Sequence, residues 1–122
     1  RVINITSIDA VHPSSVGLAH YDASKHGVWG FTKNVALELA PHKIWVNAIA
    51  PGVIATEGMA LHVSGASSGQ GRAPLKGFMA RAVLGRMGRA DDIGRVALFL
   101  ASDLASYMTG SLIVVDGGYL IS

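Results

Sequence analysis

Three short runs of aliphatic and β-branched residues constrain the fold of this chain most strongly. They are VINIT at 2–6, IWVNAIA at 44–50 and SLIVVDGG at 111–118. Nearly continuous apolar runs of this length are typical of strands buried on both faces of a parallel sheet. Longer segments with a helical pattern separate them, at 22–40, 74–84 and 91–102. Strands that alternate with helices predict βαβ crossovers, so we expect an α/β fold.

The ends of these segments carry recognisable stop and start signals. Pro41 ends the first helix, because the residue before a proline is disfavoured in the α region. Pro51 and Gly52 stop the second strand. Asp91 and Asp92 lie in the first turn of the last helix, where negative charge suits the helix dipole. We therefore expect well-defined elements connected by loops.

The predicted sheet is small for its kind. A typical sheet of this kind has about five or six strands, and only three are predicted here. Burial of the apolar run at 2–5 would need a further strand beside it. The chain also opens on Arg1, directly inside a strand. We therefore expect residues 1–122 to be the C-terminal portion of a single domain of a longer protein.

Composition excludes several classes of function. Lys and Arg exceed Asp and Glu by only two, 10 against 8, which is too mild a balance to argue for a nucleic acid or an anionic membrane as partner. Without cysteine the chain has no disulfide or thiolate metal site, and its five histidines show no metal-ligand spacing. No apolar run approaches the ~20 residues of a membrane span. We expect a cytoplasmic protein without a metal.

Tyr21 and Lys25 form the first candidate catalytic pair. They are four residues apart near the start of the predicted helix, so they share one face. A nearby cation favours the ionised form of a phenol, which suits the pair to general acid–base catalysis. An isolated pair of this spacing is more often an ordinary surface pair.

Two other segments are expected to bring hydroxyl groups to the same place. Ser7 follows the first strand, and Thr56 follows the Pro51-Gly52 turn after the second strand. In open α/β sheets, ligands bind beyond the carboxyl ends of the strands. Three separate segments therefore deliver polar groups to one rim of the predicted sheet.

These segments together resemble the later half of the short-chain dehydrogenase/reductase (SDR) family. The matching motifs, in the family's order, are NITS at 4–7, YDASK at 21–25, ALELAP at 36–41, VNAIAPGVIAT at 46–56, GRMGRADDIG at 85–94, ALFLASDLASYMTG at 97–110 and VDGG at 115–118. The resemblance implies a Rossmann-like, doubly wound parallel sheet, of which this chain holds the later βαβαβ part. It also implies an NAD(H)- or NADP(H)-dependent interconversion of an alcohol and a carbonyl.

The resemblance implies a role for each matching position. Tyr21 would exchange a proton with the substrate oxygen. Lys25 would favour the ionised form of Tyr21 and hydrogen-bond the nicotinamide ribose. Ser7 would hold and polarise the substrate oxygen. The nicotinamide pocket would be lined by Pro51, Gly52, Ile54 and Thr56.

Three further residues are candidate substrate contacts. Asp9 and His12 lie in the loop after Ser7, where the family often contacts substrate, and His20 flanks Tyr21. An ordinary loop role is the alternative for each of them. A polyol or sugar acid, a 3-oxoacyl chain and a steroid are all compatible with this loop.

The chain also departs from the family pattern. The interval from Ser7 to Tyr21 is fourteen residues, where the family often has thirteen, so Ser14 and Ser15 are fallback candidates for the catalytic serine. Lys43 stands where a glycine usually ends the helix in left-handed geometry, and Trp45 replaces the usual arginine. The residue that selects NAD or NADP belongs to the earlier half of the family's domain, so this choice stays open.

Residues 57–84 correspond to the family's variable substrate loop. Within it, Gly65, Gly69 and Gly71 look like a pyrophosphate-binding turn. Such a turn needs a buried strand before it and a helix directly after it, whereas here the preceding segment is mixed and Pro74 follows. We interpret 64–71 as a mobile lid, with a cofactor turn in a rearranged chain as the alternative.

The apolar face of the helix at 22–40 is wide enough to suggest a further contact. It covers roughly half the circumference, whereas a helix with one buried face needs about 100°. In this family the additional contact is a partner subunit, which implies a homotetramer or homodimer with a second interface on 91–102 and 111–116. Burial under the earlier half of the family's domain is the alternative.

The alternative function is that of a catalytically inactive assembly or binding module. The presence of all three catalytic candidates, Ser7, Tyr21 and Lys25, disfavours it.

Overall fold

A three-stranded parallel sheet forms the centre of the computed structural model, which describes residues 1–56 and 72–122. Its strands are β1 (Val2–Ile5), β2 (Val46–Pro51) and β5 (Leu112–Val115), in the order β1-β2-β5. In the register, Ile3 lies opposite Asn47, and Ile49 lies opposite Ile113. The predicted α/β class and the parallel pairing are confirmed.

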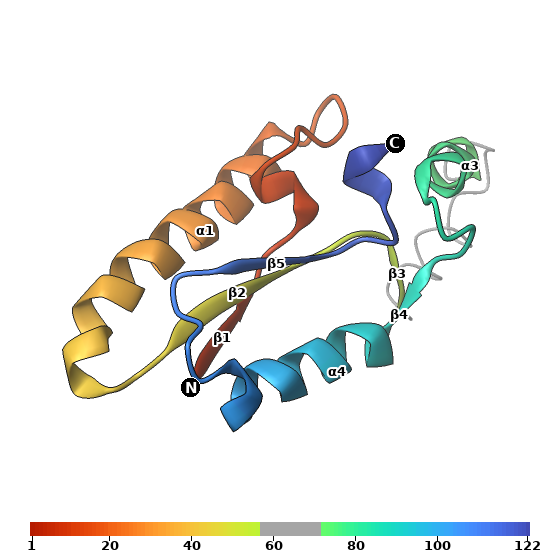
Figure 1. Ribbon diagram of the computed structural model, residues 1–122. Helices are drawn as coiled ribbons and strands as arrows, with labels where there is room; N and C mark the ends of the chain where they lie inside the picture. The colour runs from red at the N-terminus through yellow and green to blue at the C-terminus, as the bar shows by residue number, and fades with distance from the viewer. Residues whose placement is uncertain (57–71) are drawn as a thin grey trace.

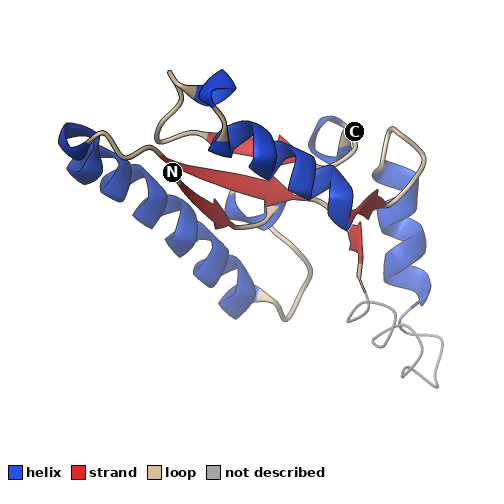
Figure 2. Ribbon diagram, turned by 90° about the horizontal axis from the view of Figure 1, so that it is seen from below, coloured by secondary structure: helices blue, strands red, loops and turns tan. Residues whose placement is uncertain are grey.

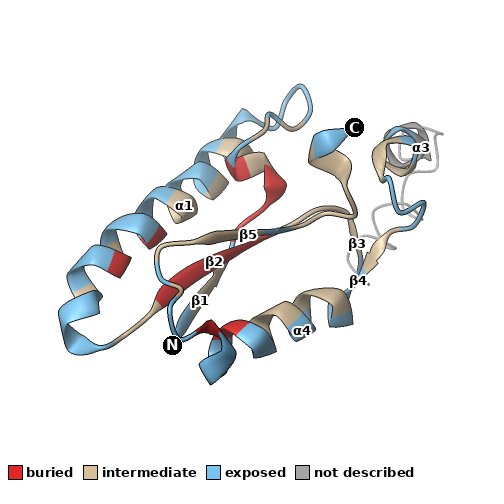
Figure 3. Ribbon diagram, in the orientation of Figure 1, coloured by how far each residue is buried: buried red, intermediate tan, exposed pale blue. Residues whose placement is uncertain are grey.

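Helices cover both faces of this sheet. The long helix α1 (Ala19–Leu39) lies on one face and α4 (Ala90–Ala101) on the other, as Figures 1 and 2 show. Residues 46–50 of the central strand β2 are all buried as a result (Figure 3). This arrangement is that of a partial doubly wound, Rossmann-like domain, because crossover helices pack on both faces of a parallel sheet.

The first strand is less buried than its apolar sequence predicts. Val2 is 37% exposed and Ile5 is 48% exposed. Within the described part of the chain, β1 pairs only with β2 and is therefore an edge strand. The prediction of a buried strand is therefore wrong for residues 1–122, because β1 has a neighbouring strand on one side only among the described residues.

Several element boundaries differ from those expected. Helix α1 begins three residues earlier than predicted, which places Tyr21 in its first turn. Helix α3 spans Arg72–Arg81 instead of 74–84. A short parallel pair of β3 (Ile54–Ala55) and β4 (Gly88–Arg89) was not expected at all. Two-residue strands carry too little pattern to be visible in a sequence.

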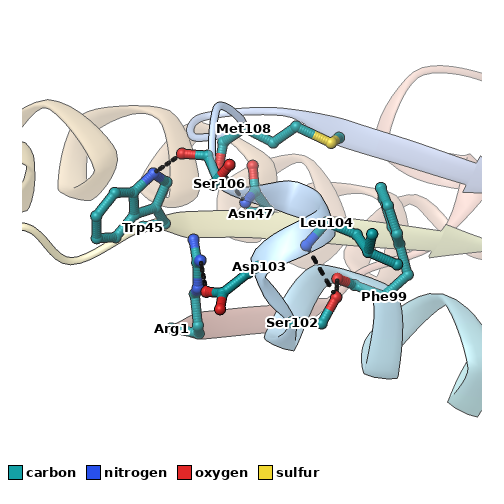
Figure 4. Close-up of polar contacts among 9 residues, drawn as sticks. All are labelled: Arg1, Trp45, Asn47, Phe99, Ser102, Asp103, Leu104, Ser106 and Met108. Atoms are coloured by element: carbon teal, nitrogen blue, oxygen red, sulfur yellow. Dashed lines mark hydrogen bonds and ion pairs between the residues drawn. The ribbon is translucent and has the colours of Figure 1, made fainter.

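Asn47 joins the central strand to the segment that leads into β5. Its side chain is buried, its Nδ2 donates to the Met108 carbonyl at 2.8 Å, and its Oδ1 accepts from the Ser111 N–H at 3.0 Å. Figure 4 shows Asn47 beneath the Met108 turn. A polar residue inside a buried strand is tolerated because both ends of its amide are satisfied.

Trp45 has a structural role at the amino end of the sheet. Its indole Nε1 donates to the Ser106 carbonyl at 2.8 Å, and the Arg1 guanidinium lies 4.5 Å from its ring centroid (Figure 4). Arg1 also contacts Asp103 at 3.5 Å. The replacement of the family's usual arginine thus brings an aromatic anchor between β2 and the turn before β5.

The turn after α1 has the strained geometry that the sequence predicted. Lys43 adopts φ 58° and ψ 37°, the left-handed conformation. Its N–H donates to the Ala40 carbonyl at 2.9 Å and closes the short 3₁₀ turn Ala40–His42. A side chain in this conformation has a steric cost that glycine avoids.

We expect Lys43→Gly to stabilise the protein by about 1 kcal/mol, because relief of the left-handed strain exceeds the extra entropy of an unfolded glycine. Urea unfolding of the full-length protein measures this change. Lys33→Gly is the matched control, since Lys33 lies inside α1, and it should destabilise by about 1 kcal/mol. A destabilising Lys43→Gly would contradict the strain argument.

Candidate active site

Ser7 lies where the chain leaves β1 and turns into the 3₁₀ helix η1 (Ile8–Ala10). It is the N-cap of this turn, and its buried Oγ accepts from the Asp9 N–H at 3.2 Å. The same Oγ donates to the Asp9 carboxylate oxygen Oδ2 at 3.0 Å. Serine is favoured at such a cap because its short side chain can satisfy a free backbone N–H. The Ser7 hydroxyl is thus held at the carboxyl end of the sheet.

Tyr21 and Lys25 lie together at the start of α1. Tyr21 is 37% exposed, and the Lys25 ammonium lies 5.5 Å from the centroid of its ring. The Thr6 hydroxyl, at the end of β1, donates to the Lys25 backbone carbonyl at 2.9 Å. This partly buried bond ties the first part of α1 to the strand that leads into Ser7. It therefore fixes the start of α1, with Tyr21 and Lys25, relative to Ser7.

Gly52 brings the end of β2 close to the end of β5. A Cβ at Gly52 would lie 2.8 Å from the Asp116 Cα, and the Gly52 N–H donates to the Val115 carbonyl at 3.0 Å. The Asp116 carboxylate accepts from the N–H groups of Gly118 and Leu120 at 2.8 and 2.9 Å. The Pro51-Gly52 and Val115-Asp116-Gly117-Gly118 motifs therefore form one packed corner.

A cavity of about 300 Å³ opens at this edge of the sheet. Its lining includes Ser7, Asp9, Tyr21, Gly52, Ile54, Thr56 and Phe78. Six of these seven residues are the candidate site residues named above, and they come from three separate segments of the chain. The cavity has the polar groups and the apolar wall of a site for a small molecule.

Four other candidates are not among the residues that line this cavity. Lys25 lies beside Tyr21, and Pro51 is the half-buried last residue of β2. His20 is exposed. His12 packs edge-on against the ring of Tyr119, with 6.0 Å between the ring centroids.

The fallback serines lie elsewhere. The Ser14 N–H donates to Asp22 Oδ2 at 3.1 Å, and Ser15 is exposed. Hydrogen bonding by Ser14 holds the pKa of the Asp22 carboxyl below its usual range. Ser7 is therefore the serine that shares a cavity with Tyr21.

Burial raises the pKa of the Asp9 carboxyl, and the nearby negative charge of Asp22 acts in the same direction. The hydrogen bond from Ser7 and the charges of His12 and His26 act against this shift. Asp9 is thus a partly desolvated carboxyl group beside the Ser7 hydroxyl.

The C-terminal turn Tyr119–Ile121 forms a contact that the sequence did not reveal. The Tyr119 ring stacks on Phe78, with 4.9 Å between the centroids, and the Arg81 guanidinium lies 4.0 Å from the same ring. Arg81 also donates to the Tyr119 hydroxyl at 3.0 Å. These contacts fix the end of α3, and with it the Phe78 wall of the cavity. No periodicity or motif in the last four residues signals this role.

The predicted lid at 64–71 and the glycine motif Gly65, Gly69 and Gly71 lie outside the described residues. Of the predicted substrate loop 57–84, the structure describes α3 and the turn that follows it. Across the described ranges 1–56 and 72–122, no group of three or more His, Asp or Glu side chains could hold a metal ion. In the same ranges no helix has the length and apolar character to cross a membrane.

Comparison with known proteins identifies the family of this chain. A family described as "Enoyl-(Acyl carrier protein) reductase" matches residues 1–120. The chain therefore belongs to this family, within the short-chain dehydrogenases/reductases.

Individual relatives are substantially longer. The chain is 39% identical over 118 residues to 3-oxoacyl-[acyl-carrier-protein] reductase FabG of Aquifex aeolicus, which covers 97% of this chain and 44% of that protein. The solved structure of 4-hydroxyisoleucine dehydrogenase complexed with NADH matches with a TM-score of 0.85 at 34% identity, over 98% of this chain and 46% of that one. A putative 2-deoxy-d-gluconate 3-dehydrogenase from Agrobacterium tumefaciens with bound NADP matches with a TM-score of 0.86 at 39% identity, over 99% and 46%.

The chain thus spans less than half the length of the curated relatives it matches. That residues 1–122 are the C-terminal portion of a single domain stays a prediction.

Proposed function

We propose that this chain carries the catalytic half of an NAD(P)(H)-dependent oxidoreductase that interconverts an alcohol and a carbonyl. The observation that carries the proposal is the cavity that brings Ser7 and Tyr21 together with Gly52, Ile54 and Thr56. Lys25, 5.5 Å from the Tyr21 ring centroid, adds the cation that such a site needs. The two solved relatives hold NADH and NADP, which supports a nicotinamide cofactor without selecting one of the two.

The residues of this chain fit the nicotinamide end of such a cofactor. The carboxyl ends of β2 and β5 approach so closely at Gly52 that backbone, not side chain, forms this part of the wall. Pro51, Gly52, Ile54 and Thr56 would hold the nicotinamide, and Lys25 and Tyr21 would face its ribose. When bound, the cofactor supplies or accepts a hydride.

The chain's own residues would supply proton transfer and orientation. Tyr21 would give a proton to the substrate oxygen during reduction and take one during oxidation. Lys25 would stabilise the ionised Tyr21 oxygen through its positive charge. Ser7, held at its cap position by Asp9, would hydrogen-bond the same substrate oxygen. Asp9, His12 and His20 stay candidate contacts to the rest of the substrate.

Lys25→Ala in the full-length protein tests this assignment. We expect cofactor affinity to fall by about 10- to 100-fold, as for loss of a hydrogen bond to a charged group, and kcat to fall as well. Fluorescence titration with NADH and NADPH measures the first effect, and cofactor-dependent alcohol oxidation measures the second.

Lys33→Ala is the matched control for this experiment. Lys33 lies on the same helix, and its ammonium is 5.1 Å from the Trp29 ring centroid, a geometry close to that of Lys25 with Tyr21. We expect this variant to keep the cofactor affinity and kcat of the unmodified protein. Equal effects of the two substitutions would count against a role of Lys25 in the site.

The inactive assembly module remains the second candidate function, and one observation favours an assembly surface. Large apolar side chains are exposed on both helices, including Phe31 and Leu37 on α1 and Leu98 on α4. They suit a homo-oligomer, either a dimer or a tetramer, and equally the cover of further residues of the same protein. The homo-oligomer and the cytoplasmic location stay predictions.

A further inference from the structure

The hydrogen bonds of Ser7 contain more information about the substrate than its position alone. A serine hydroxyl has one proton to donate. In this structure that proton goes to Asp9 Oδ2 at 3.0 Å, while the Asp9 N–H donates back to Ser7 Oγ at 3.2 Å. Ser7 can therefore donate to a substrate oxygen only if it gives up its bond to the Asp9 carboxylate.

Loss of the bond from Ser7 leaves the Asp9 carboxylate without its side-chain hydrogen-bond donor. Asp9 is partly buried and lines the same cavity as Ser7 and Tyr21. Among residues 1–56 and 72–122, Ser7 provides the side-chain hydrogen bond to Asp9, and neither of the two ion pairs involves it. A partly buried carboxylate that loses its hydrogen-bond donor without a replacement has a free-energy cost.

The cost disappears if the substrate brings a donor of its own. Resting on the function proposed above, we propose that Asp9 binds a hydroxyl or ammonium group on the carbon next to the reacting carbon of the substrate. Ser7 then donates to the reacting oxygen, and the neighbouring group donates to Asp9. One internal hydrogen bond is thus exchanged for two bonds to the substrate.

The geometry suits a substrate with two adjacent polar groups. Ser7 Oγ and Asp9 Oδ2 are 3.0 Å apart, so neighbouring substituents on one carbon–carbon bond can reach both. Burial raises the pKa of the Asp9 carboxyl, so this group is partly desolvated before a ligand binds. An alcohol with only hydrocarbon beside its hydroxyl would break the Ser7–Asp9 bond and return nothing to Asp9. The structure thus favours vicinal diols, hydroxycarbonyls and amino alcohols over purely apolar alcohols.

Two matched sets of substrates, assayed with the full-length protein and with NAD⁺ and NADP⁺, test this proposal. One is cyclohexanol, trans-cyclohexane-1,2-diol and trans-2-aminocyclohexanol, and the other is butan-2-ol, butane-2,3-diol and 3-aminobutan-2-ol. We expect kcat/KM for the diol or the amino alcohol to exceed that for the mono-alcohol by about 10- to 100-fold in at least one set.

Variants of Asp9 then identify the residue responsible. Asp9→Ala should reduce this preference to about threefold or less, mainly through a lower kcat/KM for the diol and the amino alcohol. Asp9→Asn keeps the shape and a hydrogen-bonding group but removes the charge, so it should retain part of the diol activity and lose the preference for the amino alcohol. Asp91→Asn, at an exposed position in the first turn of α4, is the control for loss of one negative charge and should change neither. Cofactor affinity and thermal midpoint show that each variant is folded.

The outcomes separate this proposal from the proposed function. Turnover of the mono-alcohols at equal or higher kcat/KM would overturn the role of Asp9 and leave the oxidoreductase intact. A preference for the diol that survives Asp9→Ala would also overturn it. Turnover of none of the six compounds by protein that binds the cofactor would count against both.

Discussion

Tyr21→Phe is expected to lower kcat by about 10³-fold in the full-length protein. The substitution removes the hydroxyl that we propose exchanges a proton with the substrate. It leaves the ring in place beside Lys25, whose ammonium is 5.5 Å from the ring centroid. General acid–base groups contribute about 10² to 10⁴ in rate, so loss of this group should affect turnover far more than binding. Steady-state kinetics in both directions and a cofactor titration measure the two quantities.

Tyr107→Phe provides the control for this experiment. Tyr107 is fully exposed and lies in the turn before β5, away from the cavity that holds Tyr21. Its variant should keep the kcat of the unmodified protein. If Tyr21→Phe retained more than about a tenth of that kcat, Tyr21 would not be the acid–base residue.

Gly52→Val is expected to disrupt the corner between β2 and β5 and to abolish cofactor binding. Even a Cβ at this position would lie 2.8 Å from the Asp116 Cα and 2.9 Å from its Cβ, and backbone atoms cannot move aside as a flexible side chain can. Overpacking in a well-packed region costs about 1–3 kcal/mol, occasionally more, and valine adds two methyl groups to the clash. We expect a loss of at least about 3 kcal/mol in the free energy of unfolding.

Urea unfolding and NADH titration of the full-length protein measure these effects. Gly27→Ala is the control, because a Cβ at Gly27 would meet no atom within 4 Å in the described structure. Within a helix, alanine is favoured over glycine by about 1 kcal/mol, so this variant should be slightly more stable. A Gly52→Val protein with unchanged stability and cofactor affinity would show that the strand ends are not packed as described.

Much of the architecture is visible in the pattern of residues. The apolar runs at 2–6, 44–50 and 111–118 predict parallel strands, and the segments between them predict helices on both faces. The left-handed geometry at Lys43 was expected from the family resemblance, because Lys43 stands where a glycine usually ends the helix. Local patterns have this power because secondary structure follows from spacing and from the conformational limits of single residues.

The catalytic candidates could also be predicted from the sequence, because strand ends and helix starts in an α/β sheet meet at one rim. Ser7, Tyr21, Gly52, Ile54 and Thr56 do line one cavity. The sequence alone could not decide between Ser7 and Ser14 as the serine of the site. This choice depends on a 3₁₀ turn that holds the Ser7 hydroxyl toward Asp9, whereas at Ser14 the backbone N–H donates to Asp22.

Contacts between distant segments needed the folded chain. Thr6 holds the start of α1 through the Lys25 carbonyl, and Tyr119 anchors α3 through Arg81 and Phe78. The partners in these contacts are 19 to 41 residues apart, and nothing in either local pattern marks the other. Spacing along the chain therefore specifies the strands, the helices and the edge of the sheet at which the candidate site residues lie. Which hydroxyl faces which carboxylate depends on long-range packing, because a hydrogen bond is decided by a few tenths of an ångström that no periodicity encodes.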